Sequence, residues 1–175
     1  TRHSPAFVEQ WALFETALEG PSGGNPFVDV TLAATFAQGD RSFEVEGFYD
    51  GQGVYRIRFS PDQPGTWTYS TRSNAALLEG VSGSFECTPA APGNHGPVRV
   101  ASRFHFAYAD GTPYRPIGTT SYAWTHQGDA LEALTLKSLA ASPFNKIRMC
   151  VFPKHYSFNN IEPPRYPFEG PPPAT

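Results

Sequence analysis

Short runs in which apolar and polar residues alternate fill the first half of the chain. Such a period of two is typical of strands with one buried and one exposed face. In residues 54–59, for example, Tyr55, Ile57 and Phe59 alternate with two arginines. Similar runs predict further strands at residues 7–15, 27–36, 41–49, 66–71 and 81–88. Turn-forming sequences separate the runs and no useful helical period occurs among them, so the pattern predicts an all-β sandwich.

The pattern changes in the second half of the chain. Residues 89–97, PAAPGNHGP, have the composition of a linker, and we place a domain boundary after Pro97. Short strands and a hairpin turn follow in residues 98–114. A strand at 115–120, a helix at 130–141 and a strand at 144–152 then predict a right-handed βαβ unit with parallel strands. The predicted domains are residues 1–97 and 98–175.

The predicted helix has recognisable start and stop signals. Asp129 is suited to cap its first turn, with Glu132 reaching back in a capping-box arrangement. Leu131, Leu134 and Leu139 recur at helical spacing. Ser142 and Pro143 end the helix.

Arg148 interrupts the last predicted strand, whose residues 146–152 read K-I-R-M-C-V-F and are nearly all apolar. Such a run is typical of a strand covered on both faces. A buried guanidinium stays charged and needs a carboxylate or an equivalent acceptor close by. Arg148 therefore belongs either to a structural ion pair with a neighbouring strand or to a binding site.

Aromatic and histidine side chains follow both strands of the βαβ unit. Tyr122, Trp124 and His126 come after the first strand, and His155 and Tyr156 after the second. Ligands gather beyond the carboxyl ends of parallel strands, so we expect these residues at one edge. Two histidines without a third ligand at a fixed spacing do not predict a metal site, and no other cofactor is predicted.

Composition narrows the classes of function. Charged residues make up 17% of the chain and aromatic residues 14%, and the net charge of −3 gives no sign of nucleic acid or an anionic membrane as partner. No apolar run is long enough to span a membrane. No signal peptide is visible, yet the chain starts at Thr1 without Met, so the cytoplasm, the periplasm and secretion all remain open. Cys87 and Cys150 lie in different modules and are read as buried thiols.

Several residues in the first 114 positions have a structural as well as a functional interpretation. Trp67 and Tyr69 would suit a sugar-stacking platform, although in a sandwich such residues belong more often to the core. His95 is interpreted as a polar loop residue, and Asp110 as a turn residue.

Six motifs in order along the chain give it a family resemblance. They are W-x-x-F-E at 11–15, N-P-F-x-D at 25–29, G-F-Y-D-G at 47–51, R-F-x-P-x-x-x-G-x-W at 58–67, G-T-T-x-Y-A-W at 118–124 and S-P-F-N-K-I-R-M at 142–149. The chain thereby resembles the DUF5060-containing glycoside hydrolases. That resemblance implies an immunoglobulin-like sandwich followed by a TIM barrel of the DUF4038 or cellulase-like type. F-N-K-I-R is also similar to the G-x-N-x-V-R-[IL] of retaining barrel glycosidases, which implies that Arg148 approaches a nucleophilic carboxylate.

The chain is too short for the whole barrel that the resemblance implies. A complete (β/α)₈ barrel needs about 200 to 250 residues, whereas only residues 115–175 remain for it. The two acids of the resembled barrels come from strands four and seven, which lie outside this sequence. Glu162 and Glu169 stand in a proline-rich tail and are interpreted as solvated loop charges. We therefore expect no catalytic residue within this chain.

The sequence supports two hypotheses of function. The first is the N-terminal part of a glycoside hydrolase acting on a poly- or oligosaccharide, with the sandwich docked on the barrel and Tyr122, Trp124, Arg148, His155 and Tyr156 lining the sugar site. The expected partners are a carbohydrate substrate and the remainder of the barrel or a partner chain, which would cover residues 147–152. The alternative is a non-catalytic carbohydrate-binding or structural sandwich module.

Overall fold

The computed structural model describes residues 4–151 and residue 157. The chain forms two compact units, Thr1–Tyr114 and Arg115–Thr175. The short strands of residues 98–114 fall in the first unit, whereas the sequence assigns them to the second domain. A compact unit need not coincide with a domain, so the boundary after Pro97 stays a prediction.

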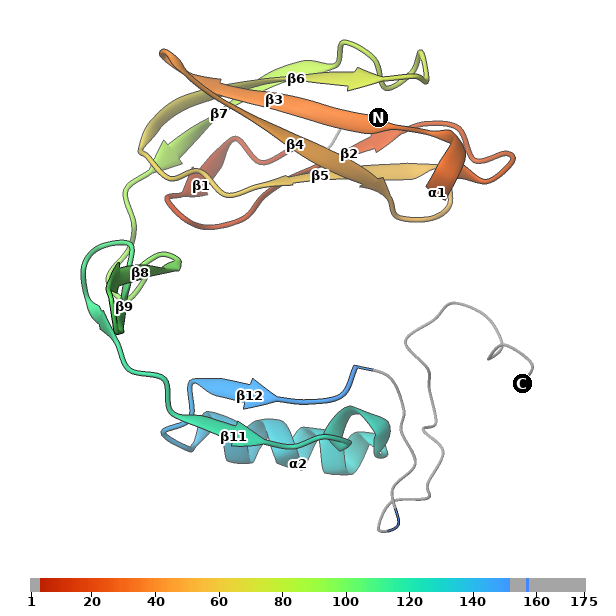
Figure 1. Ribbon diagram of the computed structural model, residues 1–175. Helices are drawn as coiled ribbons and strands as arrows, with labels where there is room; N and C mark the ends of the chain where they lie inside the picture. The colour runs from red at the N-terminus through yellow and green to blue at the C-terminus, as the bar shows by residue number, and fades with distance from the viewer. Residues whose placement is uncertain (1–3, 152–156, 158–175) are drawn as a thin grey trace. The chain divides into compact units, whose positions relative to one another are not determined.

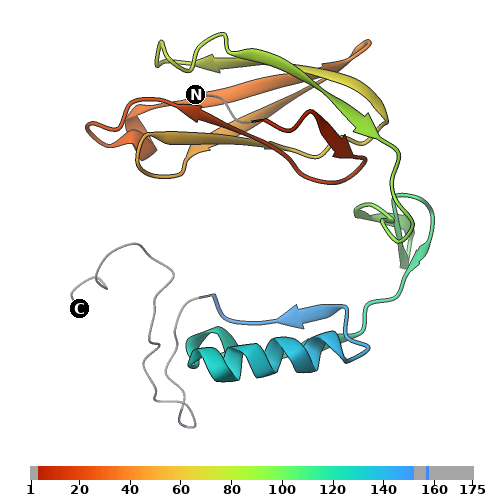
Figure 2. The ribbon, with the colours of Figure 1, turned by 180° about the vertical axis from the view of Figure 1, so that it is seen from behind.

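The described part of the first unit is built mainly of β-strands, which confirms the predicted all-β character (Figures 1 and 2). Seven strands have the order β1-β7-β6-β3-β4-β5-β2, and only β1 and β7 pair in parallel. The layers of this curled sheet face each other across a common core, as in a sandwich. The elements are β1 (Phe7–Glu9), β2 (Phe14–Glu19), α1 (Pro26–Asp29), β3 (Leu32–Gln38), β4 (Arg41–Tyr49), β5 (Val54–Phe59), β6 (Gly65–Ser73) and β7 (Ser82–Thr88).

Strand β4 contributes to both layers. Residues 41–46 pair with β3, and residues 47–49 pair with β5. Gly47 stands at the change of partner, where a Cβ atom would lie 2.7 Å from the Leu32 side chain and 3.0 Å from the carbonyl oxygen of Arg56. Only a residue without a side chain fits there, so Gly47 allows β4 to cross from one layer to the other.

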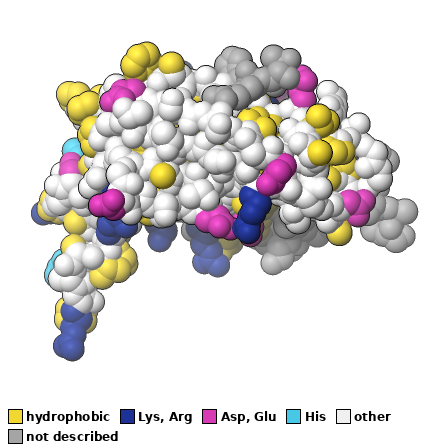
Figure 3. Space-filling model, turned by 90° about the horizontal axis from the view of Figure 1, so that it is seen from above, with side chains coloured by type: hydrophobic (Ala, Val, Ile, Leu, Met, Phe, Trp, Pro, Cys, Tyr) yellow, Lys and Arg dark blue, Asp and Glu magenta, His cyan; other side chains and the backbone are white. Residues whose placement is uncertain are grey.

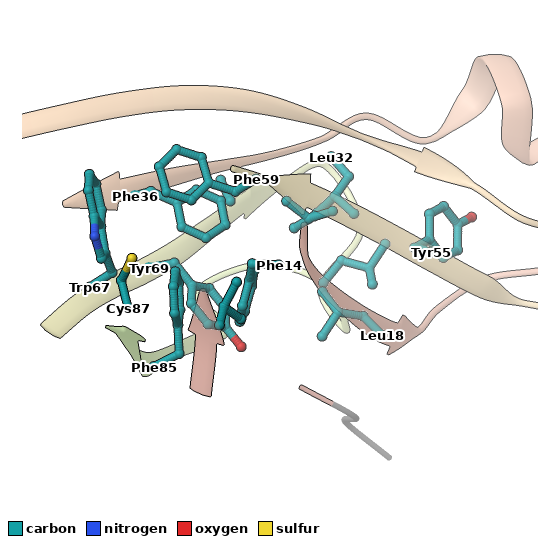
Figure 4. Close-up of a cluster of buried hydrophobic side chains, with 14 residues drawn as sticks. Phe14, Leu18, Leu32, Phe36, Tyr55, Phe59, Trp67, Tyr69, Phe85 and Cys87 are labelled. Carbon is teal, nitrogen blue, oxygen red and sulfur yellow. The ribbon is translucent and has the colours of Figure 1, made fainter. Parts of the chain in front are cut away.

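The core between the layers is dominated by aromatic rings (Figure 4). Phe14 stacks on Phe85 with the ring centroids 4.1 Å apart, and Phe36 stacks on Phe59 at 4.2 Å. Trp67 is 0% exposed, and its indole N–H donates a 3.0 Å hydrogen bond to the carbonyl of Gln63. Offset stacking and edge contacts of this kind stabilise a core beyond the area that they bury.

Two of the predicted strands are wrong in part. Residues 26–29 form the short helix α1, because Pro26 suits the first turn of a helix, and β3 begins only at Leu32. Val28, which lies within the strand predicted at 27–36, belongs to this helix and is 74% exposed. The strand predicted at 7–15 is divided into β1 and β2 at Trp11, whose φ of 65° lies in the left-handed region.

A three-stranded antiparallel sheet follows the sandwich in the first unit. Its strands are β8 (Val98–Ser102), β9 (His105–Tyr108) and β10 (Pro113–Tyr114), in the order β10-β9-β8. A register shift between Val100 and Ser102 marks a β-bulge near the β8–β9 turn. The predicted hairpin turn at 109–112 joins β9 to β10.

Residues 89–97, here called the junction segment, are attached at both ends rather than free. The Glu9 carboxylate accepts hydrogen bonds from the Ala91 N–H at 2.8 Å and from the Asn94 side chain at 2.7 Å. His95 Nδ1 lies 2.7 Å from Asp110 Oδ2 in the β9–β10 turn. The junction segment is therefore not a freely moving linker, because side chains of the sandwich and of the β9–β10 turn hold it.

These contacts favour the ionised form of both carboxyl groups. Hydrogen bonds from the Ala91 N–H and then from Asn94 lower the pKa of Glu9. The pKa of Asp110 is lowered mainly by its hydrogen bond with His95 and next by the Thr112 N–H, which lies 2.9 Å from Asp110 Oδ1. Each contribution is present above the pKa of the unfolded chain and is lost as the pH falls through the folded pKa.

The described part of the second unit contains β11 (Gly118–Thr120), the 3₁₀ helix η1 (Trp124–His126), α2 (Asp129–Ala140) and β12 (Lys146–Arg148). Both strands are shorter than predicted. The helix matches its predicted range to within a residue at each end, but Gly128 is the N-cap and no side chain caps it. The predicted capping role of Asp129 is therefore wrong. No helix within residues 4–151 is long and apolar enough to cross a membrane.

We predict that Gly47→Ala lowers the free energy of unfolding by about 1 to 3 kcal/mol, because the new methyl group overlaps Leu32 and the β5 backbone. Denaturant unfolding followed by circular dichroism measures the loss. Gly23→Ala is the matched control, since a Cβ at Gly23 meets nothing within 4 Å. Equal stability of the two variants would show that the crossing of β4 does not depend on Gly47.

We predict that acid releases the junction segment. In a pH titration by NMR, the Ala91 and Thr112 amide resonances should shift with midpoints below the ordinary carboxyl values of about 4, because the pKa values of Glu9 and Asp110 are lowered. Glu9→Gln/Asp110→Asn keeps the acceptor oxygens but does not titrate, so both shifts should vanish. Midpoints at or above the ordinary values, or shifts that persist in the double variant, would contradict this account.

Candidate functional site

The carboxyl ends of β11 and β12 lie side by side because the two strands are parallel and in register. Gly118 pairs with Lys146, and Thr120 pairs with Arg148. Beyond the strands, the Ser121 N–H donates to the Arg148 carbonyl at 3.0 Å, and the Cys150 N–H donates to the Tyr122 carbonyl at 3.0 Å. These bonds continue the pairing past the strand ends and bring residues 121–122 alongside residues 148–150.

Asn145 fastens the opposite, amino-terminal end of the same strand pair. Its side-chain oxygen accepts a 2.8 Å hydrogen bond from the Ile117 N–H, and its amide nitrogen donates to the Arg115 carbonyl at 2.9 Å. The Asn145 N–H in turn donates to the Ile117 carbonyl at 3.0 Å. The asparagine of the F-N-K-I-R motif is thus a structural residue here, a role that spacing alone did not reveal.

Arg148 and Tyr122 form the cationic and aromatic part of the site. The guanidinium carbon lies 5.3 Å from the centroid of the Tyr122 ring, within the range of a cation–π contact. Arg148 is exposed, and it forms no ion pair with any residue that the structure describes. The expected cover and carboxylate partner of Arg148 come from protein outside this sequence, so its burial stays a prediction.

Trp124 is positioned by the strand that carries Arg148. Its indole nitrogen lies 3.2 Å from the sulfur of Met149, and the side chain is half-buried in η1. His126, two residues further on, is only 4% exposed, and its Nε2 has no hydrogen-bond partner among the described residues. Sequence reasoning placed His126 after the first strand of the βαβ unit and did not predict its burial, since one histidine after a strand gives no periodic signal.

The structure brings together Tyr122, Trp124 and Arg148 from the predicted set. His155 and Tyr156 lie outside the described residues, as do Glu162 and Glu169. Their predicted positions therefore stay predictions.

The described part of the site is suited to the recognition of a ligand. It offers a cation, two aromatic rings and backbone groups. Among the described residues, no cluster of three or more metal-ligating side chains occurs. Cys87 belongs to the sandwich core, where burial raises the pKa of its thiol to about 11 and keeps it protonated at neutral pH.

The two candidate sugar-stacking residues of the sandwich are core residues. Trp67 is fully buried and Tyr69 is 3% exposed, packed 5.4 Å from the Phe36 ring. Neither ring has a face open to a ligand, so the structural interpretation of both is confirmed.

Comparison with known proteins identifies the first part of the chain. Residues 7–74 match the model of the family described as "Domain of unknown function (DUF5060)". The matched residues include most strands of the sandwich, and the match confirms the predicted resemblance to DUF5060-containing proteins. None of the curated proteins compared with the chain matches it significantly.

One solved structure is similar to nearly the whole chain. It is described as a "putative glycoside hydrolase from Bacteroides vulgatus ATCC 8482", with 49% sequence identity and a TM-score of 0.89. The match covers 94% of this chain and 32% of that protein, so the present chain spans about a third of its length. An engineered protein aligns with 52% of this chain at 17% identity and a TM-score of 0.34, a level that does not establish a shared fold.

Proposed function

We propose that this chain is the N-terminal part of a glycoside hydrolase that acts on a poly- or oligosaccharide. The single observation that carries the proposal is the parallel pair β11 and β12, joined through α2, with Tyr122, Trp124 and Arg148 at the carboxyl ends of the strands. Active sites of (β/α)₈ barrels occupy that edge. The 49% identity to a protein described as a "putative glycoside hydrolase" supports the same assignment.

Exposed apolar side chains in the second unit support the proposal. A groove of about 380 Å³ runs between β11 and α2, and its lining includes Leu131, Leu134 and Phe144. Those three side chains are 42 to 57% exposed, and α2 has no buried residue. In the proposal, the strands and helices that follow in a longer protein cover this surface, and β11, α2 and β12 are the first βαβ unit.

In the proposed site, Tyr122 and Trp124 pack against sugar rings and Arg148 binds an oxygen ligand. His155 and Tyr156 would line the same side of the sugar site. Hydrolysis needs two carboxylates, about 5 Å apart in a retaining enzyme and further apart in an inverting one. In the proposal both carboxylates come from later strands, and one of them pairs with Arg148, so residues 1–175 alone do not catalyse the reaction.

The sandwich is proposed to be an accessory domain that docks on the barrel, with the domain division after Pro97. The alternative, a non-catalytic carbohydrate-binding or structural module, loses its original candidate residues, because Trp67 and Tyr69 lie in the core. The parallel β11–β12 pair also favours the first reading, since a separate sandwich module does not require it.

We predict that the longer protein hydrolyses a polysaccharide or its oligomers and that residues 1–175 alone do not. Arg148→Ala in the longer protein should lower kcat/KM by about 100-fold, because it removes a preorganised cation at the reacting carboxylate. Arg72→Ala is the matched control, since Arg72 is an exposed arginine of the sandwich paired with Glu44. Reducing-sugar release from a panel of plant and algal oligosaccharides is the measurement.

Two outcomes would contradict the proposal. One is a longer protein without any carboxylate pair at the carboxyl ends of its parallel strands. The other is an Arg148→Ala enzyme that is as active as the Arg72→Ala control.

A further inference from the structure

The hairpin formed by β8 and β9, residues 98–108, exposes apolar side chains that the core does not use. Phe104 in the turn is 81% exposed, Val100 is 75% exposed and Phe106 is 51% exposed. The register places Val100 opposite Phe106 on one face of the sheet. No residue of β8 is buried. Exposed apolar side chains that gather on a hairpin indicate a contact surface rather than a part of the core.

The same hairpin is cationic in a chain of net negative charge. Between Glu86 and Asp110 the sequence contains no acidic residue, but it contains Arg99, Arg103 and two histidines, of which His105 lies in the hairpin. The whole chain has a net charge of −3. A polyanion would thus be repelled by the average surface and attracted by residues 98–108.

The two hairpin arginines differ from those of the sandwich. The sandwich residues Arg41, Arg56, Arg58 and Arg72 all form ion pairs with carboxylates. Arg99 and Arg103 form none with any described residue and are exposed. Within the part of the chain that the structure describes, no carboxylate therefore occupies their guanidinium groups, which can bind an anion from outside.

The cationic and aromatic groups meet at the tip of the hairpin. The guanidinium carbon of Arg103 lies 5.8 Å from the Phe104 ring centroid. His105 is the next residue along the chain, and its Nδ1 lies 3.2 Å from the Ser102 hydroxyl. Figure 3 shows Lys or Arg, His and hydrophobic side chains next to one another at the lower left of the molecule.

We propose that the β8–β9 hairpin binds a carboxylate-bearing polysaccharide, that is, a polymer of uronic acid residues. The exposed Phe104 ring packs against the apolar face of a sugar ring. Arg103 and Arg99 bind sugar carboxylates through the planar fork of the guanidinium group, which matches a carboxylate in two parallel hydrogen bonds. This inference rests on the proposed function, from which it takes a polysaccharide as the ligand. It adds that the polysaccharide is negatively charged.

Other polyanions fit the hairpin less well. Duplex nucleic acid and anionic membranes are bound by broad basic surfaces, whereas here two arginines stand beside one aromatic ring on a chain of net charge −3. A protein partner would have to cover the apolar face of Val100 and Phe106 and would not need the arginines. The combination of a stacking ring with free guanidinium groups favours a charged sugar.

Affinity electrophoresis and calorimetry of the 175-residue chain with polygalacturonate test the proposal. We expect saturable binding at low salt that weakens as salt is added, and no binding to neutral dextran. Phe104→Ala and Arg99→Ala/Arg103→Ala should each weaken binding by about tenfold or more. These side chains are exposed, so the variants should fold normally, which circular dichroism verifies. Arg72→Ala, on the sandwich surface, should bind as the unaltered chain does.

Several results would overturn the proposal. They are the absence of polygalacturonate binding, equal binding of dextran, and equal binding of a sulfated glycan, duplex DNA or vesicles of anionic phospholipid. Binding that the arginine variant loses but Phe104→Ala keeps would show simple ion exchange and would also overturn it.

The outcome can be separated from that of the proposed function. If the longer protein hydrolyses only neutral glycans while the chain ignores polygalacturonate, the hairpin inference fails and the hydrolase proposal stands. If the chain binds polygalacturonate as described but the longer protein hydrolyses nothing, the binding site stands and the hydrolase proposal fails.

Discussion

Burial of apolar surface is the constraint that separates the two units of this chain. The first unit closes a core of hydrophobic side chains around the stacked rings of Phe14, Phe36 and Phe59. In the described part of the second unit, the only buried residue is His126. A domain is stable when apolar burial outweighs the loss of conformational entropy. The sandwich meets that condition with its own residues, whereas β11, α2 and β12 bury none of their apolar side chains.

The buried core of the sandwich also supports the junction segment and the strands that follow it. Its aromatic core fixes β1, and Glu9 at the end of β1 holds the junction segment by two hydrogen bonds. His95, in the same segment, contacts Asp110 of the β9–β10 turn. The β8–β9 hairpin is therefore fastened to the core by a continuous set of hydrogen bonds. The proposed binding surface on that hairpin is therefore held in place by the sandwich.

Alternation and family motifs predicted much of the fold, and the misses have physical causes. The pattern of Tyr55, Ile57 and Phe59 identifies β5, because a half-buried strand leaves a period of two. Alternation gave a wrong prediction at residues 26–31, where Val28 continues the period of two although Pro26 starts a helical turn. At the site, motifs identified Tyr122, Trp124 and Arg148, but local sequence does not encode exposure. The environment of Arg148 depends on residues far away in the chain or outside it.

The central claim is that β11, α2 and β12 are part of a larger barrel. Amide hydrogen exchange on residues 1–175 and on the longer protein, with light scattering as a check on association, tests it most directly. In the isolated chain, the Thr119 and Ile147 amides should exchange about 100-fold faster than core amides such as Phe36, and in the longer protein they should approach the protection of the core. A monomeric 175-residue chain in which Thr119 and Ile147 are protected as strongly as Phe36 would contradict the claim.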